Sequence, residues 1–133
     1  MYERANVFDD PPRRDFLPVI EHTQKVYTEW LPIRRNMARD ERFGIGKRID
    51  DTFLNVLEQL REASYTSGNG KIVLLGKVLQ NTDLLRFFLQ IAWECELIEQ
   101  KHYILLATDV ESVGRMVGGW RKGLLSKTPP REK

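Results

Sequence analysis

The chain has 133 residues, of which 41% are hydrophobic and 30% charged, a composition that suits one folded domain and excludes a disordered polypeptide. Its 21 basic and 19 acidic side chains leave a net charge of +2, so the total charge selects no class of partner. No uncharged apolar stretch reaches the ~18 residues of a membrane span, and no secretory signal is visible, so we expect a cytoplasmic protein without membrane contact. The lone Cys95 excludes a disulfide framework and is expected to be an inert thiol in the core.

The positions of the prolines predict an all-helical chain. No proline occurs from Ile33 to Thr128, and the sixteen leucines outnumber each β-branched residue type. We expect residues 15–126 to form the folded domain. Residues 1–14 are then a flexible N-terminal arm, and residues 127–133 are a mobile C-terminal tail.

A first helix is expected from about Asp15, a favourable N-cap, with Pro18 in the opening turn, where its missing N–H group costs little. Apolar side chains recur along it at helical spacing: Leu17, Ile20, Tyr27, Trp30 and Leu31. Pro32 is expected to kink or end this helix, with a resumed helical segment through Met37 as the alternative.

A charged connection, residues 39–42, leads into the second helix at about Ile45. One stripe of this helix is apolar: Ile45, Ile49, Phe53, Val56, Leu57 and Leu60. Residues 66–70, Thr-Ser-Gly-Asn-Gly, have the composition of a loop and end it.

The third helix is predicted from about Lys71 to Cys95, with a change of apolar face in its middle. The second half has the apolar stripe Leu84, Leu85, Phe87, Phe88, Ile91, Ala92 and Cys95, whereas Ile72, Leu75 and Leu79 of the first half lie on another side. The polar residues 80–83 separate the two halves. Either the helix changes neighbours there or Asp83 makes a specific polar contact, and both interpretations stay open.

The fourth helix is predicted from about Lys101 to Leu125. Its apolar seam has steps of mostly three and four residues: Tyr103, Leu106, Val110, Val113, Val117 and Leu124. Gly114 and Gly118, at the edge of this seam, would allow a neighbouring backbone to approach, and Trp120 is expected to be a packing anchor. Four amphipathic helices with short joints predict an all-α, up-down antiparallel four-helix bundle.

The sequence offers no catalytic site. Gly70-Lys71 and Gly76-Lys77 lack the first glycine of a phosphate-binding loop. Glu99 and His102 form a single Glu-x-x-His pair, whereas a di-iron bundle needs two such pairs and two further carboxylates. We therefore expect a protein that is not an enzyme and that holds no cofactor or metal.

Basic side chains form two clusters. The first lies at residues 34–48, where six basic and two acidic side chains give a local charge of +4 (six minus two). Its basic residues are Arg34, Arg35, Arg39, Arg42, Lys47 and Arg48. The second lies at residues 109–133, where six basic and three acidic side chains give a local charge of +3 (six minus three). Its basic residues are Arg115, Arg121, Lys122, Lys127, Arg131 and Lys133. Such clusters are usually solvated faces, but arginine binds phosphate in a bidentate manner and phosphate contacts accumulate when a homo-oligomer repeats them.

Three segments carry a family resemblance: Phe43–Ile49, Asp83–Leu89 and Gly114–Trp120. Together with Lys101-His102-Tyr103, they make residues 16–125 similar to the Avd accessory proteins of diversity-generating retroelements. The wider superfamily includes the four-helix-bundle proteins encoded in intervening sequences of 23S ribosomal RNA genes.

The resemblance implies a non-enzymatic bundle that assembles into a barrel-like homo-oligomer, a homopentamer, with a basic surface. It also implies binding to a reverse transcriptase and its structured template RNA, or to DNA or an RNA–DNA hybrid, in support of mutagenic cDNA synthesis. Arg86 matches the arginine of the family's Leu-Arg-Phe segment and Arg115 that of its Gly-Arg segment, whereas Gln90 replaces a frequent basic residue. With the basic residues above, the predicted binding set is Arg34, Arg35, Arg39, Arg42, Lys47, Arg48, Arg86, Arg115, Arg121 and Lys122. The alternative is a scaffold or RNA-associated oligomer of the same superfamily without a retroelement.

Overall fold

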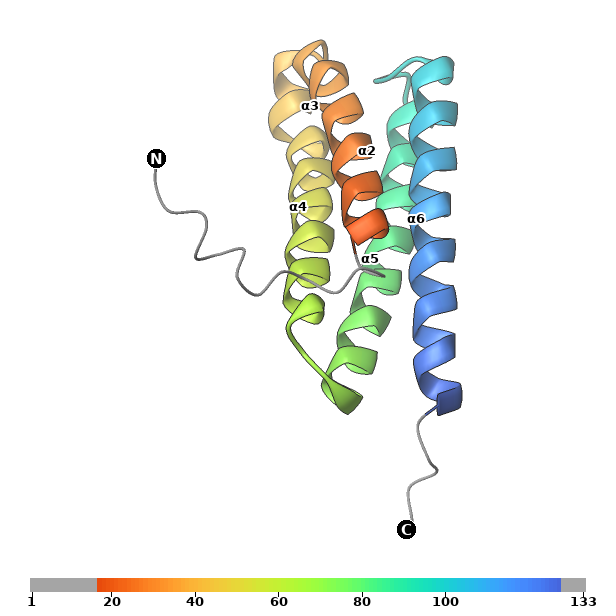
Figure 1. The fold of residues 1–133 in the computed structure, drawn as a ribbon. Helices are drawn as coiled ribbons and strands as arrows, with labels where there is room; N and C mark the ends of the chain where they lie inside the picture. Colours follow the sequence, from red (N-terminus) through yellow and green to blue (C-terminus); the bar gives the residue numbers. More distant parts are fainter. Residues whose placement is uncertain (1–16, 128–133) are drawn as a thin grey trace.

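The computed structural model describes residues 17–127, which fold into an antiparallel bundle of four long helices (Figure 1). In chain order the helices are α2 (Leu17–Arg35), the short α3 (Arg39–Phe43), α4 (Ile45–Ser64), α5 (Gly68–Glu94) and α6 (Gln100–Lys127). The predicted all-α bundle is confirmed. The arm expected at residues 1–14, the expected N-cap Asp15 and residues 128–133 lie outside the described residues.

The core lies between the four long helices. α5 packs along α4 on one side and along α6 on the other, and α2 contacts both α4 and α6. The predicted stripe of α4 is buried at Ile49, Phe53, Val56 and Leu60, and the predicted seam of α6 is buried at Leu106, Val110, Val113 and Val117. These two predictions are confirmed, because a run of apolar side chains three and four residues apart can face only one side of a helix.

A buried carboxylate ties α2 to α4. The Oδ1 atom of Asp50, a residue that is 9% exposed, accepts hydrogen bonds from the Tyr27 hydroxyl at 3.0 Å and from the indole N–H of Trp30 at 3.1 Å. Its Oδ2 atom lies 3.6 Å from the Arg34 guanidinium. Burial of a carboxylate is tolerated here because each of these groups compensates for lost hydration.

The prediction that Pro32 kinks or ends the first helix is wrong as to the ending, because α2 continues through Pro32 to Arg35. Pro32 is exposed, and so is Thr28, whose carbonyl loses its helical N–H partner. Water can satisfy that carbonyl on the outer face, while Trp30 and Ile33 keep the inner face of the helix in the core.

The connection at residues 39–42 is also different from the expectation, since it forms most of the short helix α3. Behind it, Gly44 and Gly46 make a tight corner into α4. A Cβ atom on Gly46 would lie 3.0 Å from the Glu41 carbonyl oxygen and 3.3 Å from the Met37 sulfur. The glycine at position 46 is therefore required by close approach of the backbone.

The change of apolar face predicted in the middle of the third helix does not occur. One continuous stripe of α5 is buried, and it comprises Ile72, Leu75, Val78, Thr82, Leu85, Leu89 and Ala92. Thr82 fits into this stripe because its hydroxyl donates to the Leu79 carbonyl at 2.9 Å. Among residues 17–127, Asp83 makes no hydrogen bond or ion pair, so neither interpretation of the polar segment holds.

Three residues assigned to the core stripe of the third helix lie at the surface, namely Leu84, Phe87 and Cys95. The expectation of a core thiol at Cys95 is wrong because α5 ends at Glu94. The chain then turns at Glu96, which has a φ of 61°. Cys95 is thus the C-cap residue at the end of α5, where its side chain is exposed.

Candidate nucleic-acid and partner interface

Two arginines of the first basic cluster stabilise the corner between α2 and α4. The Nε and Nη2 atoms of Arg34 donate to the Arg42 carbonyl oxygen at 3.2 and 3.1 Å. Arg42 in turn donates from Nη1 to the Met37 carbonyl oxygen at 3.2 Å. These guanidinium groups are partly buried and satisfy carbonyls that would otherwise end a helix without partners.

The other four cations of this cluster are exposed around the same corner. Lys47 forms an ion pair with Asp51 at 2.8 Å, and the guanidinium of Arg48 lies over the Phe88 ring, 5.1 Å from its centroid. Arg35 and Arg39 make no hydrogen bond or ion pair with any described residue. We call Arg35, Arg39 and Arg48 the basic corner, since none of them forms an ion pair with a carboxylate of residues 17–127.

The second basic cluster is also divided between structural and exposed residues. The Nε atom of Arg121 on α6 donates to the Ile72 carbonyl oxygen at 2.9 Å in the first turns of α5. Lys122 and Lys127 are exposed, while Arg131 and Lys133 lie beyond the described residues. Arg121 therefore joins two helices, and Lys122 points to solvent without a carboxylate partner in the described part of the chain.

The structure brings Arg86 and Arg115 together, although 29 positions separate them (115 − 86). Both line a groove between the outer faces of α5 and α6, which consists of two adjoining hollows of about 480 and 360 Å³. The hollows share three residues, Asp83, Arg86 and Glu111. We call this surface the α5–α6 groove.

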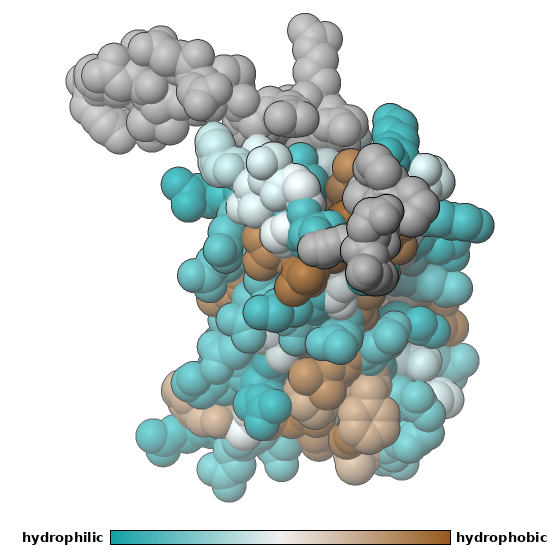
Figure 2. Space-filling view, turned by 90° about the horizontal axis from the view of Figure 1, so that it is seen from below, coloured by the Kyte–Doolittle hydropathy of each residue, from teal (hydrophilic) through white to brown (hydrophobic). Residues whose placement is uncertain are grey.

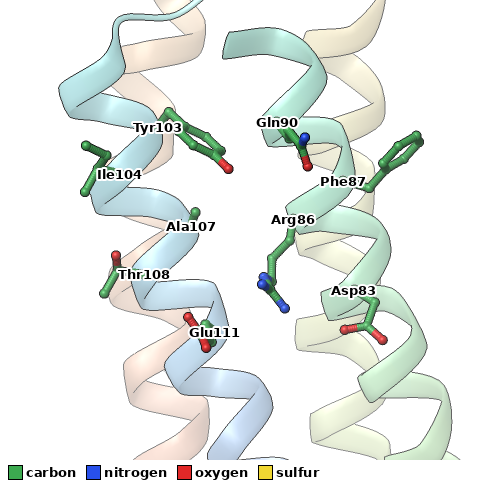
Figure 3. Close-up of a pocket in the computed structure, with 9 residues that line it drawn as sticks. All are labelled: Asp83, Arg86, Phe87, Gln90, Tyr103, Ile104, Ala107, Thr108 and Glu111. Carbon is green, nitrogen blue, oxygen red and sulfur yellow. The ribbon is translucent and has the colours of Figure 1, made fainter. Parts of the chain in front are cut away.

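The α5–α6 groove combines mixed charge with apolar walls. Figure 3 shows Arg86, Tyr103 and Ala107 pointing toward the space between the helices, while Phe87 and Ile104 lie on opposite rims. The side chains of Phe87 and Ile104 are 55% and 51% exposed. Tyr103 is held in place by a parallel stack on Trp93, with ring centroids 4.8 Å apart.

The charges of the groove cancel. Arg115 forms an ion pair with Glu111 at 3.3 Å, whereas Arg86 and Asp83 make no ion pair or hydrogen bond within residues 17–127. Two arginines and two carboxylates sum to zero. Gln90, at the far end, donates to the Glu94 carboxylate at 3.0 Å and adds no positive charge.

The small residues of α6 lie at its contact with α5. A Cβ atom on Gly114 would lie 3.5 Å from the Thr82 hydroxyl oxygen, and one on Gly118 would lie 3.9 Å from a Leu79 methyl group. Trp120 is half-buried against the core, and the Lys71 ammonium lies 5.4 Å from its ring centroid. The close backbone approach expected at Gly114 and Gly118 is therefore not seen, since both meet only side chains at ordinary contact distance, whereas Trp120 packs as expected.

A carboxyl pair between α2 and α6 escaped the sequence analysis. Burial raises the pKa of Glu29 above its ordinary value of 4.5, and a hydrogen bond to Asp109 raises it further. The Lys25 ammonium, 3.6 Å away, acts in the opposite direction. The Oε1 atom of Glu29 is buried without a hydrogen-bond partner among the described residues, so this environment favours the neutral carboxyl. Because 80 positions separate the two residues (109 − 29), no local motif could have indicated this pair.

A metal site would need several His, Cys, Asp or Glu side chains close together. Within residues 17–127, no three His, Cys, Asp or Glu residues lie together as metal ligands would. Glu99 of the single Glu-x-x-His pair instead lies 3.7 Å from the Lys101 ammonium at the surface. None of the described helices has the length and apolar character needed to cross a membrane.

Comparison with known proteins identifies the fold. No family model and no curated protein matches the sequence. A solved structure of a protein of unknown function from the S23 ribosomal protein family, from Bacteroides thetaiotaomicron VPI-5482, is similar, with a TM-score of 0.74 and 14% sequence identity. The match covers 81% of this chain and 98% of that one. The chain therefore shares its four-helix-bundle fold with a protein of the S23 ribosomal protein family.

Proposed function

We propose that this chain is a non-enzymatic accessory subunit of a diversity-generating retroelement, one that binds structured template RNA and the reverse transcriptase as a homo-oligomer. The observation that carries the proposal is the basic corner, in which Arg35, Arg39 and Arg48 have no ion-pair partner among residues 17–127 and lie beside a hydrogen-bonded helix junction. The similarity of the three sequence segments to Avd proteins selects this function among those open to a four-helix bundle.

The basic corner suits a phosphate backbone. Arg35 ends α2, Arg39 begins α3, and Arg48 lies one turn into α4, so three arginines surround one corner. The hydrogen bonds of Arg34 and Arg42 hold this corner in place. Guanidinium groups bind phosphate oxygens in a bidentate manner, and repetition around an oligomer multiplies the contacts.

An outer face of α5 supports assembly of several copies, a pentamer in our proposal. Val73 and Leu84 are exposed and Ile91 is partly so, and their spacings of eleven and seven residues put them on one side of the helix. The inner stripe of the same helix already fills the core. A helix with apolar residues on both faces is typical of one that is buried on both faces. Figure 2, an end view of the bundle, shows other hydrophobic side chains at the surface among hydrophilic ones.

The direct test of RNA binding is a titration of template RNA at several salt concentrations. We expect wild-type protein to bind with a steep salt dependence, and the double variant Arg35→Glu/Arg39→Glu to lose about two units of that slope per bound subunit. Arg61→Glu is the matched control, since Arg61 is an exposed arginine of α4 outside the basic corner. Equal affinities and slopes for all three proteins would contradict the proposal.

A second candidate is an RNA-associated bundle oligomer that serves no retroelement. It is favoured by the similar structure, which belongs to the S23 ribosomal protein family. The two candidates differ in one partner. Co-purification of wild-type protein with the reverse transcriptase supports the first, whereas RNA binding without the polymerase supports the second.

A further inference from the structure

We propose that the α5–α6 groove is the docking site for an amphipathic helix of the reverse transcriptase, and that it is not an RNA-binding surface. This inference rests on the proposed function and assigns its two partners to different faces of the bundle. It separates Arg86 and Arg115 from the arginines of the basic corner.

The charges of the groove argue against a nucleic acid. A phosphate backbone passing Arg86 and Arg115 would also pass the carboxylates of Asp83 and Glu111, which line the same hollows. Glu111 already neutralises Arg115 at 3.3 Å. A polyanion would therefore lose by repulsion what it gains from Arg86.

A polypeptide can match these charges one by one. Arg86 and Asp83 have no ion-pair partner among the described side chains and lie three residues apart on α5. A partner that carries a carboxylate opposite Arg86 and a cation opposite Asp83 satisfies both, which a polymer of one charge cannot do. Complementary charges of this kind select the partner and its orientation.

The apolar rims of the groove favour a helix over an extended strand. Phe87 and Ile104 lie at the outer edges of the groove and point away from its middle, where the small Ala107 leaves room for a larger apolar side chain of the partner (Figure 3). The backbone groups of α5 and α6 are already paired within their helices, so an extended segment would find no main-chain partners there. A helix brings its own backbone hydrogen bonds and presents anchors at i, i+3, i+4 and i+7.

The length of the groove sets the size of the docked element. It extends along α6 from Tyr103 to Arg115, which is twelve residue-to-residue steps and about 18 Å at the rise of an α-helix. A partner helix of three to four turns fills that distance. Such a helix would lie across both α5 and α6 as an additional member of the bundle.

The test measures binding of the purified reverse transcriptase and of the template RNA, separately, to the same set of variants. Arg86→Glu reverses the unpaired charge, and Ile104→Asp places a charge on the apolar rim. Leu105→Asp is the matched control, because Leu105 is the next residue of α6, is 42% exposed and does not line the groove. Circular dichroism and sedimentation of each variant report its fold and its oligomer mass.

We expect both groove variants to weaken reverse-transcriptase binding at least tenfold, with RNA affinity within twofold of wild type, and Leu105→Asp to change neither. Wild-type affinity for the polymerase in both groove variants would overturn the assignment while leaving the proposed function intact. An equal loss of RNA affinity would make the groove a phosphate site, and a changed oligomer mass would make it a contact between copies. Failure of the wild-type protein to bind the polymerase would instead overturn the proposed function itself.

Discussion

Removal of the Asp50 carboxylate is the most direct test of what holds α2 against α4. In Asp50→Ala the indole N–H of Trp30, a fully buried residue, loses its acceptor at 3.1 Å. A buried donor without a partner costs about 1–3 kcal/mol. The Tyr27 hydroxyl and the Arg34 guanidinium lose a partner too, but both are partly exposed and retain access to water.

Together these losses predict a decrease of about 3 kcal/mol in the free energy of unfolding, equivalent to roughly 10 °C in Tm for a domain of this size. Asp51→Ala, one residue away, removes only an exposed ion pair with Lys47 and is expected to cost about 0.5 kcal/mol or less. Both variants are compared with wild type by thermal and urea unfolding, followed by far-ultraviolet circular dichroism at one protein concentration. Equal midpoints for Asp50→Ala and Asp51→Ala would refute the proposed role of this network.

Three further predictions follow from the packing of the helices. The pKa of Glu29 is raised in the folded state, so its protonated carboxyl contributes stability that is fully present below the unfolded pKa of 4.5. This contribution is lost as the pH rises through the folded pKa. Glu29→Gln should therefore flatten the dependence of Tm on pH in that range. A pH dependence identical to wild type would contradict the raised pKa of Glu29. Gly118→Leu should lower Tm by more than Gly123→Leu, at a cost of about 1–3 kcal/mol, because a Cβ atom meets a neighbour only at position 118; equal melting curves would count against this. Leu84→Glu should reduce the oligomer mass measured by light scattering without unfolding the protein, and an unchanged mass would exclude this face from assembly.

The sequence alone determined the helical class, the antiparallel bundle and the inner faces of α4 and α6. These followed because their apolar residues recur every three or four positions and leave the opposite face polar. In α5 the same rule selected the wrong residues, since apolar side chains occur on all its sides. Leu84 and Phe87 were assigned to the core, while Thr82, which lies in it, was treated as an interruption.

The basic residues show what local patterns cannot decide. The sequence grouped them into two clusters by proximity along the chain, but Arg121 donates to a carbonyl 49 positions away. Arg34 and Arg42 likewise bind backbone oxygens at a helix corner. An arginine has the same charge whether it supports the fold or binds a partner. What distinguishes the two is whether a backbone carbonyl lies close enough in the folded structure to accept its hydrogen bonds.

Only the tertiary structure decided which charged groups face each other. It placed Arg86 and Arg115 in one groove with two carboxylates, and it brought Glu29 against Asp109 across 80 positions of sequence. In an amphipathic helix, periodicity predicts the side that faces the core, because the apolar pattern can be read along that helix alone. The pairing of polar side chains depends on which helices are neighbours and on their axial alignment, and these are set when the whole bundle packs.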